Sequence, residues 1–349
     1  MRISIDKLIH GGSGMGMVEG KKIFVPFAAP GDLLDVEITA DHGGFAEAKI
    51  VRIIETSPSR VTPPCPVFGQ CGGCQWQHLS YEAQLFWKRE ILIESLTRIG
   101  KISSPEVAET IPSPKMWRYR NRIQLHVDSQ GRVGFYKPRS KEVVEFEECA
   151  IADEQINVEL KVRRAEIAQR DRGMSLRVDP EAPFAQVNSQ QNERLKELLA
   201  STLKELPHES VLELYAGSGN FTRALAAIAA HVVASDIDGK AVRMGRQMLA
   251  KEGISNVDFL CKPGAAAARR LTAGCDAVIL DPPRSGCADI VEALAQLRPK
   301  SILYISCDPA TLARDALALS AHGYRFLRST PIDMFPQTFH IESLSVFTS

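Results

Sequence analysis

The chain has 349 residues, of which 44% are hydrophobic and 24% are charged. This length exceeds what one ordinary domain needs, so two or three domains with conventional hydrophobic cores are expected. Lysine and arginine together number 42, and aspartate and glutamate together also number 42, so the formal net charge is zero. This balance excludes a basic field over the whole molecule, and any nucleic acid would have to be held by local patches.

The N-terminal segment and the apolar runs of the sequence predict neither a signal peptide nor a membrane span. The N-terminus, MRISIDKLIHGG, lacks an apolar stretch long enough for a signal peptide. The longest apolar run, residues 225–234, contains His231 and is far shorter than a membrane span. We therefore expect a cytoplasmic protein without a membrane partner. In that compartment, eight cysteines favour metal binding or catalysis over disulfide bonds.

Residues 1–58 read as short strands separated by glycines. The segments 22–27 and 35–38 alternate between apolar and polar residues, as half-buried strands do. A five-stranded β-barrel of the OB type fits this pattern. A stretch rich in serine and proline, residues 57–64, follows as a linker.

Residues 59–182 predict a central α+β domain. An amphipathic pattern over 81–99 predicts a helix ending at Gly100. The segments 123–127 and 133–136 predict a hairpin, and a charged helix is expected over 153–170.

From residue 183 to the C-terminus, strand and helix patterns alternate, which is typical of a doubly wound and mainly parallel sheet. Helices are expected over 221–229 and 239–252. The expected strands are 210–215, 231–235, 257–260, 277–280 and 301–306.

The first of these strands runs into a glycine turn that contains Gly217 and Gly219. Small residues there let the backbone approach a ligand closely, and Asp236, after the next strand, can accept hydrogen bonds from both ribose hydroxyls of an adenosine. A third glycine is absent, so the turn differs from the fingerprint of dinucleotide enzymes. It is closer to the first motif of class I methyltransferases.

Two later strands run into Asp281 and Cys307. In an open α/β sheet, ligands bind beyond the carboxyl ends of the strands, so both side chains are expected at a substrate site. A small buried cysteine is the plainer reading of Cys307. The start of a helix near Thr311 favours a reactive thiolate instead.

Four segments together resemble the RNA uracil-C5 methyltransferase family: 214–221, 281–284, 306–315 and 333–336. The resemblance extends over essentially the whole chain. It implies an α/β fold with a C-terminal Rossmann-like class I methyltransferase domain, an N-terminal TRAM-type OB barrel and a central iron–sulfur α+β domain. The full set is typical of the branch that contains the bacterial 23S rRNA uracil-C5 methyltransferases.

The resemblance also implies the chemistry. Cys307 matches the nucleophile that adds to carbon 6 of uracil, so that carbon 5 can attack the methyl group of S-adenosylmethionine. Glu342 matches the base that then removes the carbon 5 proton; by position alone it is only a strand carboxylate. The residues that match cofactor contacts are Gln186, Tyr215, Asn220, Asp236 and Asp281. The chain departs from the family pattern at four positions. Ala216 replaces a frequent cysteine, Asp308 the usual asparagine and Asp236 a frequent glutamate, and Pro263 lies where some relatives have a polar cofactor contact.

Four cysteines form a separate candidate site: Cys65, Cys71, Cys74 and the distant Cys149. Their spacing allows either a structural zinc or a 4Fe–4S cluster held by four thiolates. The resemblance selects the 4Fe–4S cluster. Because methyl transfer needs no redox partner, a structural role is expected for it.

The expected function is therefore methylation of carbon 5 of a uridine in RNA by a monomeric enzyme, with 23S rRNA favoured over tRNA as the target. Two alternatives remain: an amino-methyltransferase that uses Asp281, and an RNA-binding module with an idle catalytic domain. The target base must leave its stack. Candidate contacts to the opened RNA are Phe184, Trp117, Tyr119, the basic segment 117–122, and the basic group of Lys137, Arg139 and Lys141.

Overall fold

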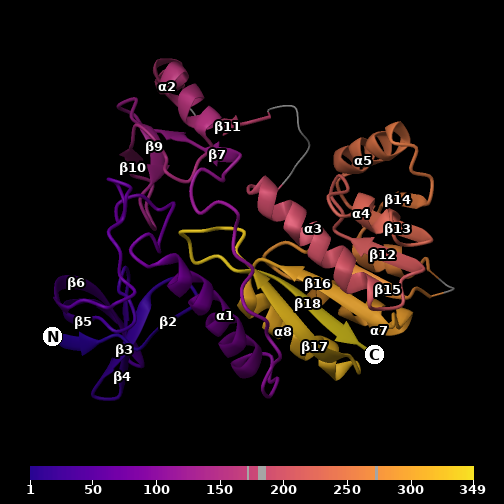
Figure 1. Ribbon diagram of the computed structural model, residues 1–349, viewed down its shortest axis with the longest axis horizontal. Helices are drawn as coiled ribbons and strands as arrows, with labels where there is room; N and C mark the ends of the chain where they lie inside the picture. The colour runs from indigo at the N-terminus through magenta and orange to yellow at the C-terminus, as the bar shows by residue number, and fades with distance from the viewer. Residues whose placement is uncertain (171–172, 180–185, 272–273) are drawn as a thin grey trace. The chain divides into compact units, whose positions relative to one another are not determined.

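The computed structural model describes residues 1–170, 173–179, 186–271 and 274–349 (Figure 1). Its contacts divide the chain into two compact units. Unit 1 comprises residues 1–91, 113–180 and 335–340, and unit 2 comprises residues 92–112, 181–334 and 341–349. The finer division into domains 1–58, 59–182 and 183–349 stays a prediction.

Unit 1 begins with a six-stranded sheet in the order β1-β5-β6-β4-β3-β2. Alternate strand residues such as Ile23 and Val25 are buried in its core. A Cβ on Gly16 would lie 2.0 Å from the backbone oxygen of Ser4, so only glycine allows β3 to approach β1 this closely. The strands are β1 (Arg2–Ser4), β2 (Lys7–Leu8), β3 (Gly14–Val18), β4 (Lys21–Val25), β5 (Leu33–Asp41) and β6 (Phe45–Glu55).

The sheet therefore has six strands where five were expected. The extra strand is short, since β2 has only two residues, too few to show an alternating pattern. All neighbouring strands are antiparallel except β4 and β6, which are parallel. Closure of this sheet into an OB-type barrel stays a prediction.

The remainder of unit 1 confirms the predicted hairpin, with Val127 opposite Val133, and the predicted second helix, whose N-cap is Asp153. The predicted first helix is also present, although the left-handed residue after it is Lys101 and not Gly100. The sheets are ordered β10-β9-β8 and β11-β7. Helix α1 (Tyr81–Arg98) belongs to unit 1 only up to residue 91, and its residues from 92 on belong to unit 2. The other elements are β7 (Arg122–Gln124), β8 (His126–Val127), β9 (Val133–Tyr136), β10 (Val143–Glu145), α2 (Glu154–Ala168) and β11 (Ser175–Arg177).

Unit 2 is built on a seven-stranded sheet in the order β14-β13-β12-β15-β16-β18-β17 (Figure 1). The five strands β12 to β16 all run parallel to one another. Strand β18 is antiparallel to both of its neighbours, β16 and β17. All five strands expected in this region are present, and the doubly wound fold is confirmed. The strands are β12 (Ser210–Leu214), β13 (His231–Asp236), β14 (Val257–Cys261), β15 (Ala277–Leu280), β16 (Ser301–Ser306), β17 (Arg325–Ile332) and β18 (Glu342–Thr348).

Helices cover both faces of this sheet. On one face, Leu212 and Leu280 pack with residues such as Leu294 and Leu312 of α7 and α8. On the other face, Ala234 and Phe259 pack with α5. The helical elements are α3 (Ser189–Lys204), α4 (Thr222–Ala226), α5 (Gly239–Lys251), α6 (Gly264–Ala268), the 3₁₀ turn η1 (Ala288–Ile290), α7 (Val291–Leu297) and α8 (Pro309–Ala321).

Because helices occupy both faces, the carboxyl ends of the parallel strands are the edge available for a ligand. No helix in the part of the chain that the structure describes is long and apolar enough to cross a membrane.

Candidate active site

Three predicted residues meet at the carboxyl edge of the sheet in unit 2. Asp281 follows β15 directly, and Cys307 follows the neighbouring strand β16. Strand β18 runs antiparallel to β16, with Ser343 opposite Ser306. The first residue of β18, Glu342, therefore lies beside Cys307 at the end of β16. Glu342 reaches this edge only because the last strand is reversed.

The charges around Cys307 act against one another. Burial and the Glu342 carboxylate raise the pKa of the thiol to about 11, while the guanidinium of Arg284 lowers it. Cys307 also precedes the N-terminus of α8, where the Asp308 side chain accepts a hydrogen bond of 2.8 Å from the amide of Thr311. Burial thus outweighs the expected effect of the helix start, and the neutral thiol is favoured in the free protein.

Both neighbouring carboxyl groups are also easier to protonate than usual. Glu342 is 2% exposed, and burial together with Asp281 raises its pKa to about 8. Burial raises the pKa of Asp281 to about 7. Near neutral pH, Glu342 is therefore largely protonated, and its repulsion of a thiolate at Cys307 is weakened. A carboxyl group with this pKa is also a stronger base than an ordinary glutamate once it loses its proton.

The glycine turn after β12 is held by Asp236. Its carboxylate accepts one hydrogen bond from the amide of Gly217 and one from the amide of Asp238, each 2.8 Å long. The residue before the turn, Tyr215, and the glycines of the turn have positive φ, with +95° at Gly219. A carboxylate has about four lone-pair positions, so Asp236 keeps acceptor capacity for hydroxyl groups of a ligand.

The side chains of two other predicted cofactor residues, Tyr215 and Asn220, have hydrogen-bond partners within the protein. The Tyr215 hydroxyl donates to Asp289, 3.4 Å away. The side-chain amides of Asn220 and Asn192 of α3 pair reciprocally at 2.9 and 3.1 Å. Asn220 is therefore engaged by the helix, and its contact with a cofactor stays a prediction. Gln186 lies in the short segment before α3.

Sequence reasoning missed Glu213, a buried carboxyl group near the carboxyl end of β12. The Thr222 hydroxyl donates to one of its oxygens, and the other oxygen has no hydrogen-bond partner among the described residues. Burial, followed by Asp281 and Asp236, raises its pKa to about 8. Register places it opposite Ile279 and Ala234, so Asp281 and Asp236, two residues further on, share its face of the sheet. A single charged residue within an otherwise apolar strand was the available signal.

A second group of missed residues braces the loop after Asp281. The buried Asp315 of α8 accepts hydrogen bonds of 2.8 Å from the Tyr304 hydroxyl and from the amide of Cys287. Arg314 donates to the backbone oxygen of Ser285 at 2.7 Å. Helix α8 thus fixes the loop that contains Arg284, whose positive charge acts on Cys307.

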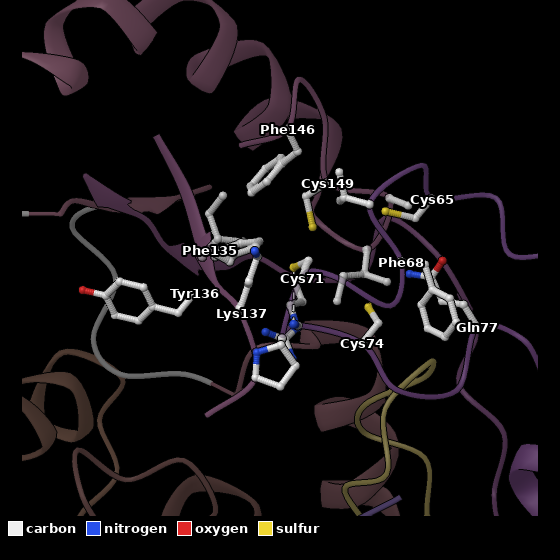
Figure 2. Close-up of a pocket in the computed structure, with 18 of the residues that line it drawn as sticks. Cys65, Phe68, Cys71, Cys74, Gln77, Phe135, Tyr136, Lys137, Phe146 and Cys149 are labelled. Carbon is white, nitrogen blue, oxygen red and sulfur yellow. Dashed lines mark hydrogen bonds between the residues drawn. The ribbon is translucent and has the colours of Figure 1, made fainter. Parts of the chain in front are cut away.

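The four predicted cysteine ligands line one cavity of unit 1, with a volume of about 410 Å³. Figure 2 shows the sulfurs of Cys65, Cys71, Cys74 and Cys149 around the same space. The amide of Gly73 donates to the Cys71 sulfur at 3.3 Å, a contact that stabilises a thiolate. Burial raises the pKa of Cys71 to about 11 and that of Cys74 to about 12.

The iron–sulfur cluster predicted at these cysteines stays a prediction. Within residues 1–170, 173–179, 186–271 and 274–349, no group of three or more His, Cys, Asp or Glu side chains is arranged to hold one metal ion. The four thiols instead surround a space. Four thiolates around a space of this kind are the donor set of an iron–sulfur cluster.

Of the predicted RNA contacts, Tyr119 is contradicted by the structure, and the others stay predictions. Tyr119 is buried, and its hydroxyl donates to the backbone oxygen of Pro336 at 2.9 Å, so its assignment as an RNA contact is wrong. Trp117 packs partly against the same core. Lys137 and Arg139 form ion pairs with Glu142 and Glu47. Phe184 lies outside the described residues.

Comparisons with known proteins show which family the chain resembles. A family model described as tRNA (Uracil-5-)-methyltransferase matches residues 154–348, and a model of the TRAM domain of tRNA (uracil(54)-C(5))-methyltransferase matches residues 1–59. An uncharacterized RNA methyltransferase of Bdellovibrio bacteriovorus is 34% identical over 99% of this chain and 94% of its own. The 23S rRNA (uracil(1939)-C(5))-methyltransferase RlmD of Alkalilimnicola ehrlichii is 31% identical over 99% of this chain and 96% of its own.

Among solved structures, the crystal structure of Pyrococcus abyssi tRNA (uracil-54, C5)-methyltransferase in complex with S-adenosyl-L-homocysteine superposes with a TM-score of 0.75. The two sequences are 26% identical, and the match covers 100% of both chains. Sequence and fold therefore agree along the whole length. The chain belongs to the family of S-adenosylmethionine-dependent RNA (uracil-5-)-methyltransferases.

Proposed function

We propose that this protein methylates carbon 5 of a specific uridine in 23S rRNA through a transient covalent bond between Cys307 and carbon 6 of the base. The observation that carries the proposal is the meeting of Cys307, Glu342 and Asp281 at one edge of the sheet. A nucleophile with a base beside it is what carbon 5 methylation requires.

The residues have separate roles in this reaction. The Cys307 thiol loses its proton, and its sulfur adds to carbon 6, which makes carbon 5 nucleophilic. Bound S-adenosylmethionine supplies the methyl group. Glu342 then removes the proton from carbon 5, the electrons of that C–H bond restore the ring double bond, and the sulfur leaves carbon 6. Arg284 lowers the pKa of Cys307 and so favours the first step.

The cofactor is assigned to the neighbouring strand ends. Asp236 accepts the ribose hydroxyls beside the glycine turn, and Gln186, Tyr215, Asn220 and Asp281 complete the contacts. The spare acceptor capacity of Asp236 and its fixed position beside Gly217 support this assignment.

The four cysteines are assigned to a structural 4Fe–4S cluster, held by Cys65, Cys71, Cys74 and Cys149. Their shared cavity and the amide donated to the Cys71 sulfur support it. Cluster binding must displace thiol protons, because burial raises the pKa values of these cysteines.

The target RNA has two candidates. The RlmD relatives of three bacteria, named for 23S rRNA, favour rRNA. The Pyrococcus abyssi enzyme, named for tRNA, matches the full chain and favours tRNA as the second candidate. Parallel methylation of a 23S rRNA fragment and of a tRNA transcript distinguishes the two. A monomeric state is also proposed, and light scattering would test it.

The mechanism is tested with RNA that contains 5-fluorouridine in place of uridine. Fluorine at carbon 5 cannot be removed as a proton, so wild-type protein with S-adenosylmethionine should form a protein–RNA adduct that survives denaturing electrophoresis. The Cys307→Ala variant should form no adduct and no 5-methyluridine. The exposed Cys261 offers a matched control, since Cys261→Ala should behave as wild type.

Two results would contradict the proposal. Methylation that persists in Cys307→Ala would indicate amine chemistry instead. RNA binding without any binding of S-adenosylmethionine would indicate an RNA-binding module.

A further inference from the structure

The cavity that the four cysteines share is also lined by an arginine, Arg120, which is partly buried. The backbone of Arg120 is fixed on both sides: its amide donates to the oxygen of Ile151 at 2.8 Å, and its oxygen accepts from the amide of Asp153 at 2.8 Å. These bonds hold Arg120 against the segment that follows Cys149. Its position in the cavity is therefore set by the fold.

The guanidinium of Arg120 has no acidic partner. No ion pair links it to a carboxylate within the described part of the chain, and its Nε is buried without a hydrogen-bond partner there. Its side chain interacts with the hydroxyl of Tyr119, which is not a carboxylate. A buried and unbalanced cation is costly, so a compensating anion is expected nearby.

The groups that face this charge are the cysteines. Cys65, Cys71, Cys74 and Cys149 all line the same cavity as Arg120. Neutral thiols would not compensate the guanidinium. Four thiolates that bind an iron–sulfur core would, because their combined charge exceeds that of the core and leaves the group negative.

We propose that Arg120 is a positioning residue that neutralises the negative charge of the iron–sulfur group and donates hydrogen bonds to its sulfur ligands. This inference rests on the proposed cluster and goes beyond it, because it assigns a function to a residue that is not a ligand. Charge and hydrogen bonds near the sulfurs set the reduction potential of such clusters.

The test compares Arg120→Met, which removes the charge, with Arg120→Lys, which keeps it. All proteins are purified without oxygen, and iron content, loss of iron to a chelator and midpoint potential are measured. Without the charge, the more negative reduced state is destabilised most, so Arg120→Met should have a lower potential and lose iron about tenfold faster. Arg120→Lys should retain a potential close to that of wild type.

Arg132→Met is the matched control, because Arg132 is surface-exposed, pairs with Asp128 and does not line the cavity. Should Arg120→Met fail to fold, judged by circular dichroism, Arg120→Gln tests the same loss of charge. A potential in the neutral variant equal to that of iron-containing wild type would overturn the role of Arg120 and leave the cluster in place. Wild-type protein without iron would instead overturn the cluster itself.

Discussion

Asp308 influences Cys307 and helix α8 in opposite ways. As the N-cap of α8, it accepts the amide of Thr311 and stabilises the helix. Burial is the main cause of the raised pKa of Cys307, but the negative charge of Asp308 adds to it. The family resemblance predicts an asparagine here, so this chain keeps the cap and adds a charge that disfavours the thiolate.

Asp308→Asn should therefore lower the pKa of Cys307 without loss of stability, because asparagine caps helices as well as aspartate does. The measurement is the rate of Cys307 alkylation against pH, followed by peptide mass spectrometry to separate it from the exposed Cys261. Asp308→Ala is the control: it removes the same charge but should cost about 1 kcal/mol through loss of the cap. An alkylation profile of Asp308→Asn identical to that of wild type would contradict the electrostatic role.

Glu342 has a distinct test, because its proposed role begins after the methyl group has been transferred. Glu342→Gln should still add Cys307 to the base and methylate it, but should be unable to remove the carbon 5 proton. With ordinary uridine-containing RNA, a covalent adduct should then accumulate, and turnover should fall by a factor on the order of 10² to 10⁴. The Cys307→Ala/Glu342→Gln double variant should show no adduct. Wild-type turnover in Glu342→Gln would remove Glu342 from the mechanism.

At the scale of elements, the parallel strands were predictable because each is a short apolar run bounded by turn residues. The sequence pattern could not show the direction of β18, since alternation reads the same in both directions. That reversal brings Glu342 to Cys307. Strands of two or three residues, such as β2 and β11, were also missed because pairing, and not pattern, defines them.

The site was predicted unevenly for a related reason. Cys307 and Asp281 follow strands that are visible in the sequence, so their location could be inferred. The brace around Asp315 joins a helix, a strand and a loop, and such contacts exist only after folding. Arg120 was taken as part of a basic patch because only folding places it in the cavity of the distant cysteines.

The loop that α8 braces gives a prediction of its own. Gly286 has φ of +83°, and an added Cβ would lie 2.3 Å from the Asp315 carboxylate. Gly286→Ala should therefore strain the backbone and displace the loop that carries Arg284. We expect a loss of about 1–3 kcal/mol of stability together with reduced methylation.

Gly323→Ala separates the two causes of this loss. Gly323 has φ of +92°, but an added Cβ would have no atom within 4 Å. Gly323→Ala therefore has the backbone strain of Gly286→Ala without its close contact. Urea unfolding and methylation assays should show a larger defect in both properties for Gly286→Ala. Equal effects of the two variants would show that the contact with Asp315 is unimportant.

At the scale of the whole molecule, the two candidate sites belong to different units: the cysteines to unit 1, and Cys307 with its carboxyl neighbours to unit 2. Unit 2 concentrates three carboxyl groups with raised pKa values at one sheet edge: Glu213 at about 8, Asp281 at about 7 and Glu342 at about 8. In each case burial is the main cause. Although the formal charge of the chain is balanced, ionising these buried carboxyl groups in the folded protein costs free energy.

This cost predicts how stability depends on pH. In the unfolded chain these glutamates ionise near their ordinary value of 4.5, whereas in the folded protein they retain protons up to about 8. Between these values the folded state binds more protons, so the free energy of unfolding of unit 2 should fall as pH rises through this window. Urea unfolding at about pH 6 and about pH 9 measures the loss.

The Glu213→Gln variant removes one of these carboxyl groups outside the proposed proton transfer, so its free energy of unfolding should fall less between the two pH values. The control is Glu193→Gln, at an exposed ion pair with Lys196, which should follow wild type. Equal losses in Glu213→Gln and wild type would mean that Glu213 is ionised in the folded protein at neutral pH.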